Sequence, residues 1–134
     1  MTVVTTSRKP APEVRTLARD MAFSIGAGYV TRGKAGMGDL FSLDESVLIV
    51  SKSGPFFLIL LYDGGELVTE IRIRSFAVEE RAGAIARGLF VSDRPVYEAL
   101  RNHADTVFAG ESLTEHRIVF DGTQRRRYTL KVAS

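Results

Sequence analysis

Two apolar runs separated by a short gap constrain the fold of this chain more than any other feature. Residues 47–50 and 56–62 are continuously apolar, as strands buried on both faces are. Because residues 51–55 alone separate them, the two strands are expected to pair antiparallel. Residues 63–65 read Asp-Gly-Gly and predict a hairpin turn into a third strand. The centre of the chain is therefore predicted to be an antiparallel meander.

Amphipathic helices are predicted on both sides of this meander. After a β-branched strand at residues 3–6, Pro12 suits the first turn of a helix, and Gly26 suits its end. A second long helix is predicted to begin at Pro95. In both helices the apolar residues recur at i, i+3, i+4 and i+7. The two stripes are Val14, Leu17, Ala18, Met21, Ala22 and Ile25, and Val96, Ala99, Leu100, His103, Ala104 and Val107.

The chain is predicted to close with a β-hairpin, whose strands cover residues 113–120 and 124–132. The order of elements is then β-α-β-α, a meander, β-α and a hairpin. At 134 residues the chain has the commonest size of one domain. We therefore predict a single compact α/β domain over residues 1–134, in which helices pack on a mixed sheet.

Composition excludes several classes of protein. The sequence has no cysteine, so disulfides and thiolate metal sites are ruled out. The N-terminal region has basic residues but no apolar segment behind them, which argues against a signal peptide. The longest apolar run, residues 56–62, is far shorter than the roughly 20 residues of a membrane span. A cytoplasmic protein without membrane contact is expected.

The charge distribution says more than the net charge of +2. Residues 1–38 carry six basic side chains against two acidic ones, a net charge of +4. Residues 117–134 carry five against one, again +4, so the middle of the chain carries −6. Two basic ends that meet in the fold would form one positive surface, which favours an RNA partner.

The basic residues of the last strand have a regular spacing. Arg125, Arg127 and Lys131 are expected on one face of that strand, at intervals that can follow a phosphate backbone. The alternative is edge protection, since cationic side chains also prevent exposed strands from pairing with other chains. Phosphate contact is the preferred interpretation.

Catalytic motifs are weak. Residues 28–34 match G-x-x-x-x-G-K, but Ala35 stands where a phosphate-binding loop needs the hydroxyl that holds Mg²⁺. The same stretch contains G-x-x-G, the backbone clamp of KH domains, a match that a glycine cluster produces easily. His103 and His116 lack the spacing of a metal site or a catalytic set. We predict no enzyme activity, no metal, no cofactor and no small-molecule substrate.

Two stretches of the sequence are distinctive. The first is Thr5-Thr6-Ser7-Arg8-Lys9-Pro10, followed by Arg15 on a helix. The second is Tyr29-Val30-Thr31-Arg32-Gly33-Lys34, followed by a short helix expected at residues 39–44. Both resemble the signatures of the Brix-domain family of ribosome-biogenesis proteins, in its minimal archaeal form. Ala11 and Thr31 stand where the family usually has serine and asparagine.

This resemblance implies an α/β fold of two structurally similar halves, akin to the anticodon-binding domains of class II aminoacyl-tRNA synthetases. It also implies binding of precursor rRNA and assistance in rRNA processing and subunit assembly, without catalysis. The positions that carry the family's motif and become candidate RNA contacts are Ser7, Arg8, Lys9, Arg15, Arg32 and Lys34.

Charge and spacing add four further candidates, Arg19, Arg125, Arg127 and Lys131. The leading hypothesis is thus an rRNA-binding assembly factor that works beside ribosome-assembly proteins. The alternative is a protein-protein adaptor in a pre-ribosomal particle, which docks through its acidic middle without touching RNA. A nucleotide-binding enzyme is a distant third.

Overall fold

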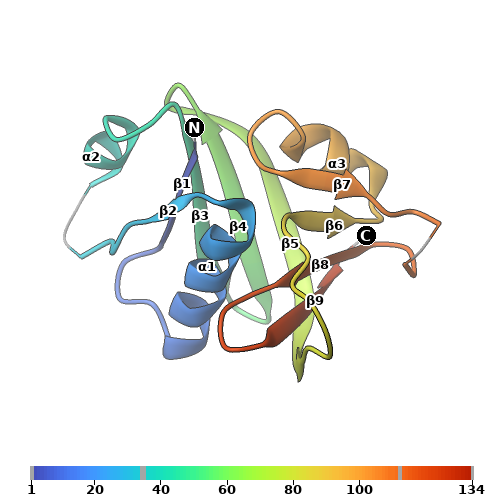
Figure 1. The fold of residues 1–134 in the computed structure, drawn as a ribbon. Helices are drawn as coiled ribbons and strands as arrows, with labels where there is room; N and C mark the ends of the chain where they lie inside the picture. Colours follow the sequence, from blue (N-terminus) through green and yellow to red (C-terminus); the bar gives the residue numbers. More distant parts are fainter. Residues whose placement is uncertain (1, 34–35, 112, 134) are drawn as a thin grey trace.

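A computed structural model describes residues 2–33, 36–111 and 113–133 of the chain (Figure 1). Strands dominate it and helices are few. In chain order its elements are β1 (Thr2–Thr6), α1 (Pro12–Ile25), β2 (Gly28–Tyr29), α2 (Met37–Phe41), β3 (Ser46–Ser53), β4 (Phe56–Asp63), β5 (Glu66–Glu80), β6 (Leu89–Val91), α3 (Arg94–Leu100), β7 (Thr106–Phe108), β8 (Arg117–Asp121) and β9 (Arg126–Val132).

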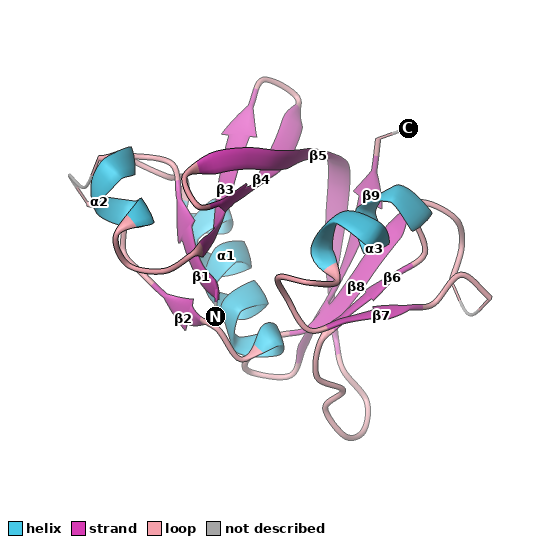
Figure 2. Ribbon diagram, turned by 90° about the horizontal axis from the view of Figure 1, so that it is seen from above, coloured by secondary structure: helices cyan, strands magenta, loops and turns pink. Residues whose placement is uncertain are grey.

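All these strands form one mixed, curled sheet of nine strands in the described residues, in the order β2-β1-β3-β4-β5-β9-β8-β6-β7. The long strand β5 lies at its centre and pairs with β4 through its first part and with β9 through its second. Each half carries a β-α-β unit at its outer end, β1-α1-β2 or β6-α3-β7, and the strands of each unit pair in parallel. Seen from above, the sheet curls around α1 (Figure 2). The chain is thus a single compact α/β domain with a mixed sheet.

The first helix forms as predicted. Pro12 opens α1, and Gly26 ends it in the left-handed conformation, with φ of 70°. Its apolar stripe packs on the concave face of the sheet in one core with residues of both halves, such as Leu48 and Leu130. The central meander is also confirmed, because β3 and β4 pair antiparallel over their full length. Strand β5 extends through residues 77–80, which the apolar pattern did not identify as strand.

A second, smaller cluster lies on the convex face of the first half. The short helix α2 spans Met37–Phe41 rather than residues 39–44, and its Leu40 is fully buried against Val47 and Ile49 of β3. Leu43, included in the predicted helix, is 53% exposed. In the first half, α2 therefore packs over the convex face of the sheet.

The prediction of a second long helix is wrong. Helix α3 ends at Leu100, and Val107 lies in strand β7, which pairs with β6. The carbonyl of His103 accepts a hydrogen bond from Thr2, and its ring Nδ1 lies 2.9 Å from the Ser46 hydroxyl. These contacts tie His103 to the first half of the chain, and the helix does not continue through it. The helical spacing of the apolar residues does not encode such contacts.

The strands of the closing hairpin are shorter than predicted. Strand β8 begins at Arg117 rather than at residue 113, because His116 has φ of 60° and interrupts extended backbone. Strand β9 begins at Arg126, because Gln124 and Arg125 have φ of 52° and 59° and belong to the turn. Within β9 the predicted alternation holds, with Tyr128, Leu130 and Val132 buried.

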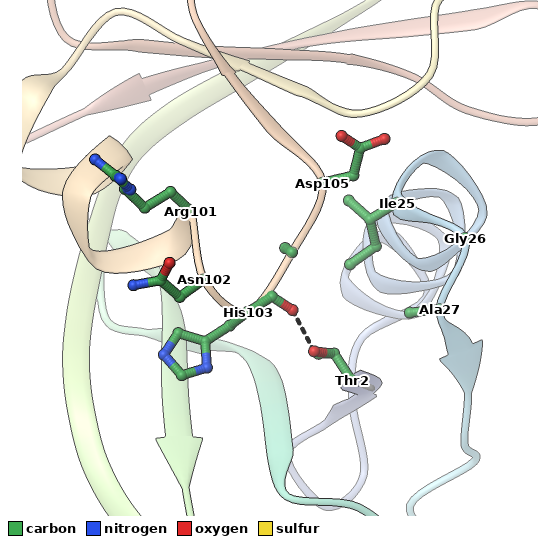
Figure 3. Close-up of a pocket in the computed structure, with 9 residues that line it drawn as sticks. Thr2, Ile25, Gly26, Ala27, Arg101, Asn102, His103 and Asp105 are labelled. Carbon is green, nitrogen blue, oxygen red and sulfur yellow. Dashed lines mark hydrogen bonds between the residues drawn. The ribbon is translucent and has the colours of Figure 1, made fainter.

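The two halves meet along a seam at the end of α1. Ser24 and Gly88 exchange hydrogen bonds of 2.9 and 3.1 Å across it. Beside them a hollow of about 300 Å³ lies between the end of α1 and residues 101–105, where the Thr2 hydroxyl reaches the His103 carbonyl (Figure 3). Among the described residues the longest helix has 14 residues, and no helix is long and apolar enough to cross a membrane.

Candidate nucleic-acid interface

A basic hollow of about 380 Å³ lies in the β1-α1-β2 unit. Because β1 and β2 are parallel, their carboxyl ends meet at one edge of the sheet, where ligands of open α/β sheets commonly bind. The loops that leave these two strands face the first half of α1. The residues that line this basic hollow are Thr6, Lys9, Pro10, Arg15, Arg19, Tyr29, Thr31, Arg32 and Gly33.

Arg32 braces the floor of the basic hollow. Its side chain crosses from the loop after β2 to the end of β1, where Nη1 donates to the Thr6 carbonyl at 3.1 Å. Its Nη2 lies 3.8 Å from the Met37 sulfur, and the residue is only 9% exposed. Arg32 therefore places a positive charge at the floor of the basic hollow and holds the loop after β2 against the end of β1.

The other cations stand at the rim of the basic hollow. Arg15 and Arg19 lie one turn apart on the same flank of α1, and both are exposed. The Arg19 guanidinium lies 5.3 Å from the centre of the Tyr29 ring, a cation-π contact that orients it. Lys9 is exposed on the loop after β1, with φ of 50°. Cations on three segments thus surround one hollow, an arrangement suited to an anionic ligand.

The remaining candidates of the two signatures vary in position. Ser7 is half-buried, and its backbone N–H donates to the Val50 carbonyl at 3.1 Å, which anchors the first signature to β3. Arg8 is exposed next to Lys9. Lys34 and Ala35, on which the phosphate-loop comparison depended, lie outside the described residues.

The C-terminal candidates are not brought to the basic hollow. Arg127 is engaged by Asp121 on the neighbouring strand, with its Nε 2.8 Å from the carboxylate. Arg125 was predicted to share one face of the last strand with Arg127 and Lys131. It lies instead in the turn before β9, where it is exposed. Lys131 is exposed on the convex face of the sheet, away from the buried side chains of β9.

A buried carboxylate that the sequence did not single out holds the final hairpin. Asp20 of α1 is fully buried and accepts hydrogen bonds from Arg126 Nε at 2.8 Å, from the Thr123 hydroxyl at 2.6 Å, and from the Tyr128 hydroxyl. Burial alone would raise the pKa of Asp20, but these hydrogen bonds outweigh it and the pKa lies below its ordinary value. Burial and the bond to Asp20 raise the pKa of Tyr128.

The basic hollow and the final hairpin therefore lie on different flanks of α1. Arg19 and Asp20 are consecutive residues, so their side chains point about 100° apart around the helix axis. Arg19 faces Tyr29 and the basic hollow, whereas Asp20 faces the turn of the hairpin. The two positive ends of the sequence meet at one helix but do not merge into one pocket.

The histidines have structural partners. His116 Nδ1 lies 2.8 Å from Asp93, whose carboxylate also caps α3 by accepting from the Val96 N–H. Within the described residues no group of three His, Cys, Asp or Glu side chains is placed to hold a metal ion.

Two curated archaeal proteins are similar in sequence to part of this chain. No family model matches the sequence. A protein of Archaeoglobus fulgidus named "Probable Brix domain-containing ribosomal biogenesis protein" is 38% identical over 72 residues, which cover 53% of this chain and 47% of that protein. A protein of the same name from Methanococcoides burtonii is 40% identical over 48 residues, 36% of this chain and 31% of the relative. The matches thus span about half, or less, of these relatives.

Two crystal structures share the fold of this chain. One is Mil, an archaeal Imp4-like protein, with a TM-score of 0.65 and 20% identity over 98% of this chain and 97% of its own. The other is a probable ribosomal biogenesis protein from Aeropyrum pernix, with a TM-score of 0.65 and 15% identity over 99% and 95% of the two chains. The curated relatives confirm the predicted resemblance to Brix-domain proteins, and the two crystal structures show that the fold is shared.

Proposed function

We propose that residues 1–134 form a Brix-like domain that acts in ribosome biogenesis by binding precursor rRNA through the basic hollow. The observation that carries this proposal is the convergence of Lys9, Arg15, Arg19 and Arg32 on one hollow from three segments of the chain. The names of the curated relatives support a role in ribosome biogenesis. The charge and shape of the hollow support RNA as the ligand.

The chemistry of the basic hollow favours phosphate groups over base edges. Arginines and lysines bind phosphate oxygens through charge-assisted hydrogen bonds, which position an RNA without reading its sequence. Tyr29, half-buried beneath Arg19, offers little free ring surface for base stacking. We therefore expect recognition of the shape and backbone of folded rRNA, in the cytoplasm, without catalysis. A likeness to anticodon-binding domains of class II synthetases would fit this mode.

Binding of a structured rRNA fragment across a salt series tests the proposal. Affinity should fall steeply with salt, because each phosphate contact contributes about 0.7 to 0.9 to the slope of log affinity against log salt concentration. Arg15→Ala should lower both affinity and slope, while Arg74→Ala, which removes an exposed arginine of β5, should change neither. A flat salt profile, or equal effects of the two variants, would refute phosphate binding at the hollow.

A further inference from the structure

The convex face of the sheet is covered by a helix in the first half and not in the second half, among the residues that the structure describes. In the first half α2 covers it, burying Leu40 against Val47 and Ile49. In the second half, α3 and α1 pack on the concave face with Leu89, Val91 and Ile118. Because strand side chains alternate between faces, Phe90 and Val119 point to the convex face. Apolar side chains therefore stand where the first half places its covering helix.

An apolar hollow of about 400 Å³ marks this uncovered position. Val107, at the edge of the sheet, is 42% exposed, and Phe90 and Val119 are half-buried. Its lining residues come from strands and loops, with none from the helices of the described chain. They include Phe90, Val107, Phe108, Val119, Phe120 and Arg127.

Charge on the same face indicates what would cover this apolar hollow. Arg127 is engaged by Asp121, and Glu79 faces it from β5. One step further along the strands, about 6.5 Å beyond Val119 and Thr129, Arg117 and Lys131 stand opposite each other. Arg117 donates to the carbonyls of Glu115 and His116, and Lys131 is exposed. An apolar hollow beside two cations complements an apolar surface flanked by carboxylates.

We propose that this convex face of the second half docks an amphipathic helix of a partner protein, with leucine or phenylalanine in the apolar hollow and acidic residues against Arg117 and Lys131. The helix α2 of the first half shows what such a cover looks like, since it places Met37, Leu40 and Phe41 on the sheet beside Asp39. The lining favours a protein over RNA, because bases stack on open aromatic rings. Phe90 and Phe108 are half-buried and Phe120 is fully buried, whereas the exposed residue of the lining is the aliphatic Val107.

Two synthetic helical peptides of equal length test this docking. Both carry leucine and phenylalanine on one face; one has glutamate on the flanks and the other lysine. The glutamate peptide should bind the isotope-labelled protein about tenfold more tightly, and its NMR shift changes should centre on Phe90, Val107 and Val119. Val107→Glu should weaken this binding about tenfold. The matched control Val68→Glu, at a strand valine that is 46% exposed in the first half, should leave it unchanged.

Three outcomes would overturn the proposal. The first is that the glutamate peptide leaves Phe90, Val107 and Val119 unperturbed. The second is equal weakening by Val107→Glu and Val68→Glu, which would reflect non-specific binding. The third is that single-stranded polyuridine, and not the peptide, shifts these residues, which would make the face an RNA surface. The result is independent of RNA binding at the basic hollow, which uses other residues.

Discussion

The two ends of the sequence carry the same net charge of +4, yet the fold uses them differently. Around the basic hollow, Lys9, Arg15 and Arg19 stand exposed at a rim. In the final hairpin, Arg126 and Arg127 are hydrogen-bonded to Asp20 and Asp121, two carboxylates that are buried in the fold. The first end therefore leaves three cations exposed around a hollow, whereas the second end pairs two of its five cations with buried carboxylates.

This difference follows from where the carboxylates lie. Near the final hairpin, Asp20 comes from a helix distant in sequence, whereas Asp121 comes from the paired strand of the hairpin itself. A buried carboxylate requires a cation and hydrogen bonds, and its partner is therefore constrained. Net charge per segment cannot distinguish these two situations.

Arg126→Ala should produce the largest effect. Removal of this guanidinium leaves Asp20 buried without its cation, and we expect a loss of about 3 kcal/mol of unfolding free energy. The neighbouring Arg125→Ala should cost less than about 0.5 kcal/mol, since Arg125 is exposed in the turn. Urea unfolding measures both. Equal losses would contradict the structural role of Arg126.

Arg127→Ala should have a smaller effect on stability, about 2 kcal/mol, which is typical of a hydrogen bond to a charged group. Asp121 keeps a second donor, the Ala86 N–H at 2.9 Å, which softens the loss. RNA affinity per folded molecule should stay unchanged. Suppose instead that Arg127→Ala lowers RNA affinity as much as Arg15→Ala does and leaves the unfolding free energy unchanged. The final hairpin would then be part of the RNA-binding surface.

Acid should weaken the contacts that Asp20 and Asp121 make with the final hairpin. Burial opposes ionisation of Asp20 and Asp121, but their hydrogen bonds outweigh it and hold both pKa values below the ordinary range. A lowered carboxyl pKa stabilises the fold above the unfolded pKa of about 4, and this contribution is lost as pH falls through the folded pKa. Unfolding free energy measured against pH should therefore decline in acid, and less so for Asp20→Asn. An unchanged acid dependence in that variant would contradict the assignment.

Arg125→Gly should give the smallest effect. Arg125 has φ of 59°, a conformation that glycine adopts without strain, so the variant should gain about 0.5 kcal/mol of stability. Thermal unfolding measures the gain. RNA affinity should change by less than about twofold; a larger loss would show that the turn contacts RNA.

The sequence predicted the elements whose pattern is local. The stripe of α1, the paired apolar runs of β3 and β4, and the Gly26 terminus depend on neighbouring residues, and all were predicted. The short α3 and the interrupted strand before β8 were missed. Their limits depend on contacts such as His103 with Ser46 and on the positive φ of His116, which apolar spacing does not encode.

The candidate site was predictable to the same extent. The two signature stretches named Lys9, Arg15 and Arg32, and the parallel pairing of β1 with β2 accounts for their convergence. The separation of the hairpin arginines was not predictable. It depends on Asp20, which in sequence is one acidic residue on a helix and in the structure is the fully buried acceptor that holds the hairpin.

The salt dependence of rRNA binding in two double variants tests the central claim most directly. Arg15→Ala/Arg19→Ala and Arg125→Ala/Lys131→Ala each remove two exposed cations, the first pair at the basic hollow and the second at the C-terminal end. We predict that the first double variant lowers the slope of log affinity against log salt concentration by about 0.7 to 0.9 per lost contact. The second should leave the slope unchanged. Equal reductions in both, or a reduction only in the second, would contradict the assignment of RNA binding to the basic hollow.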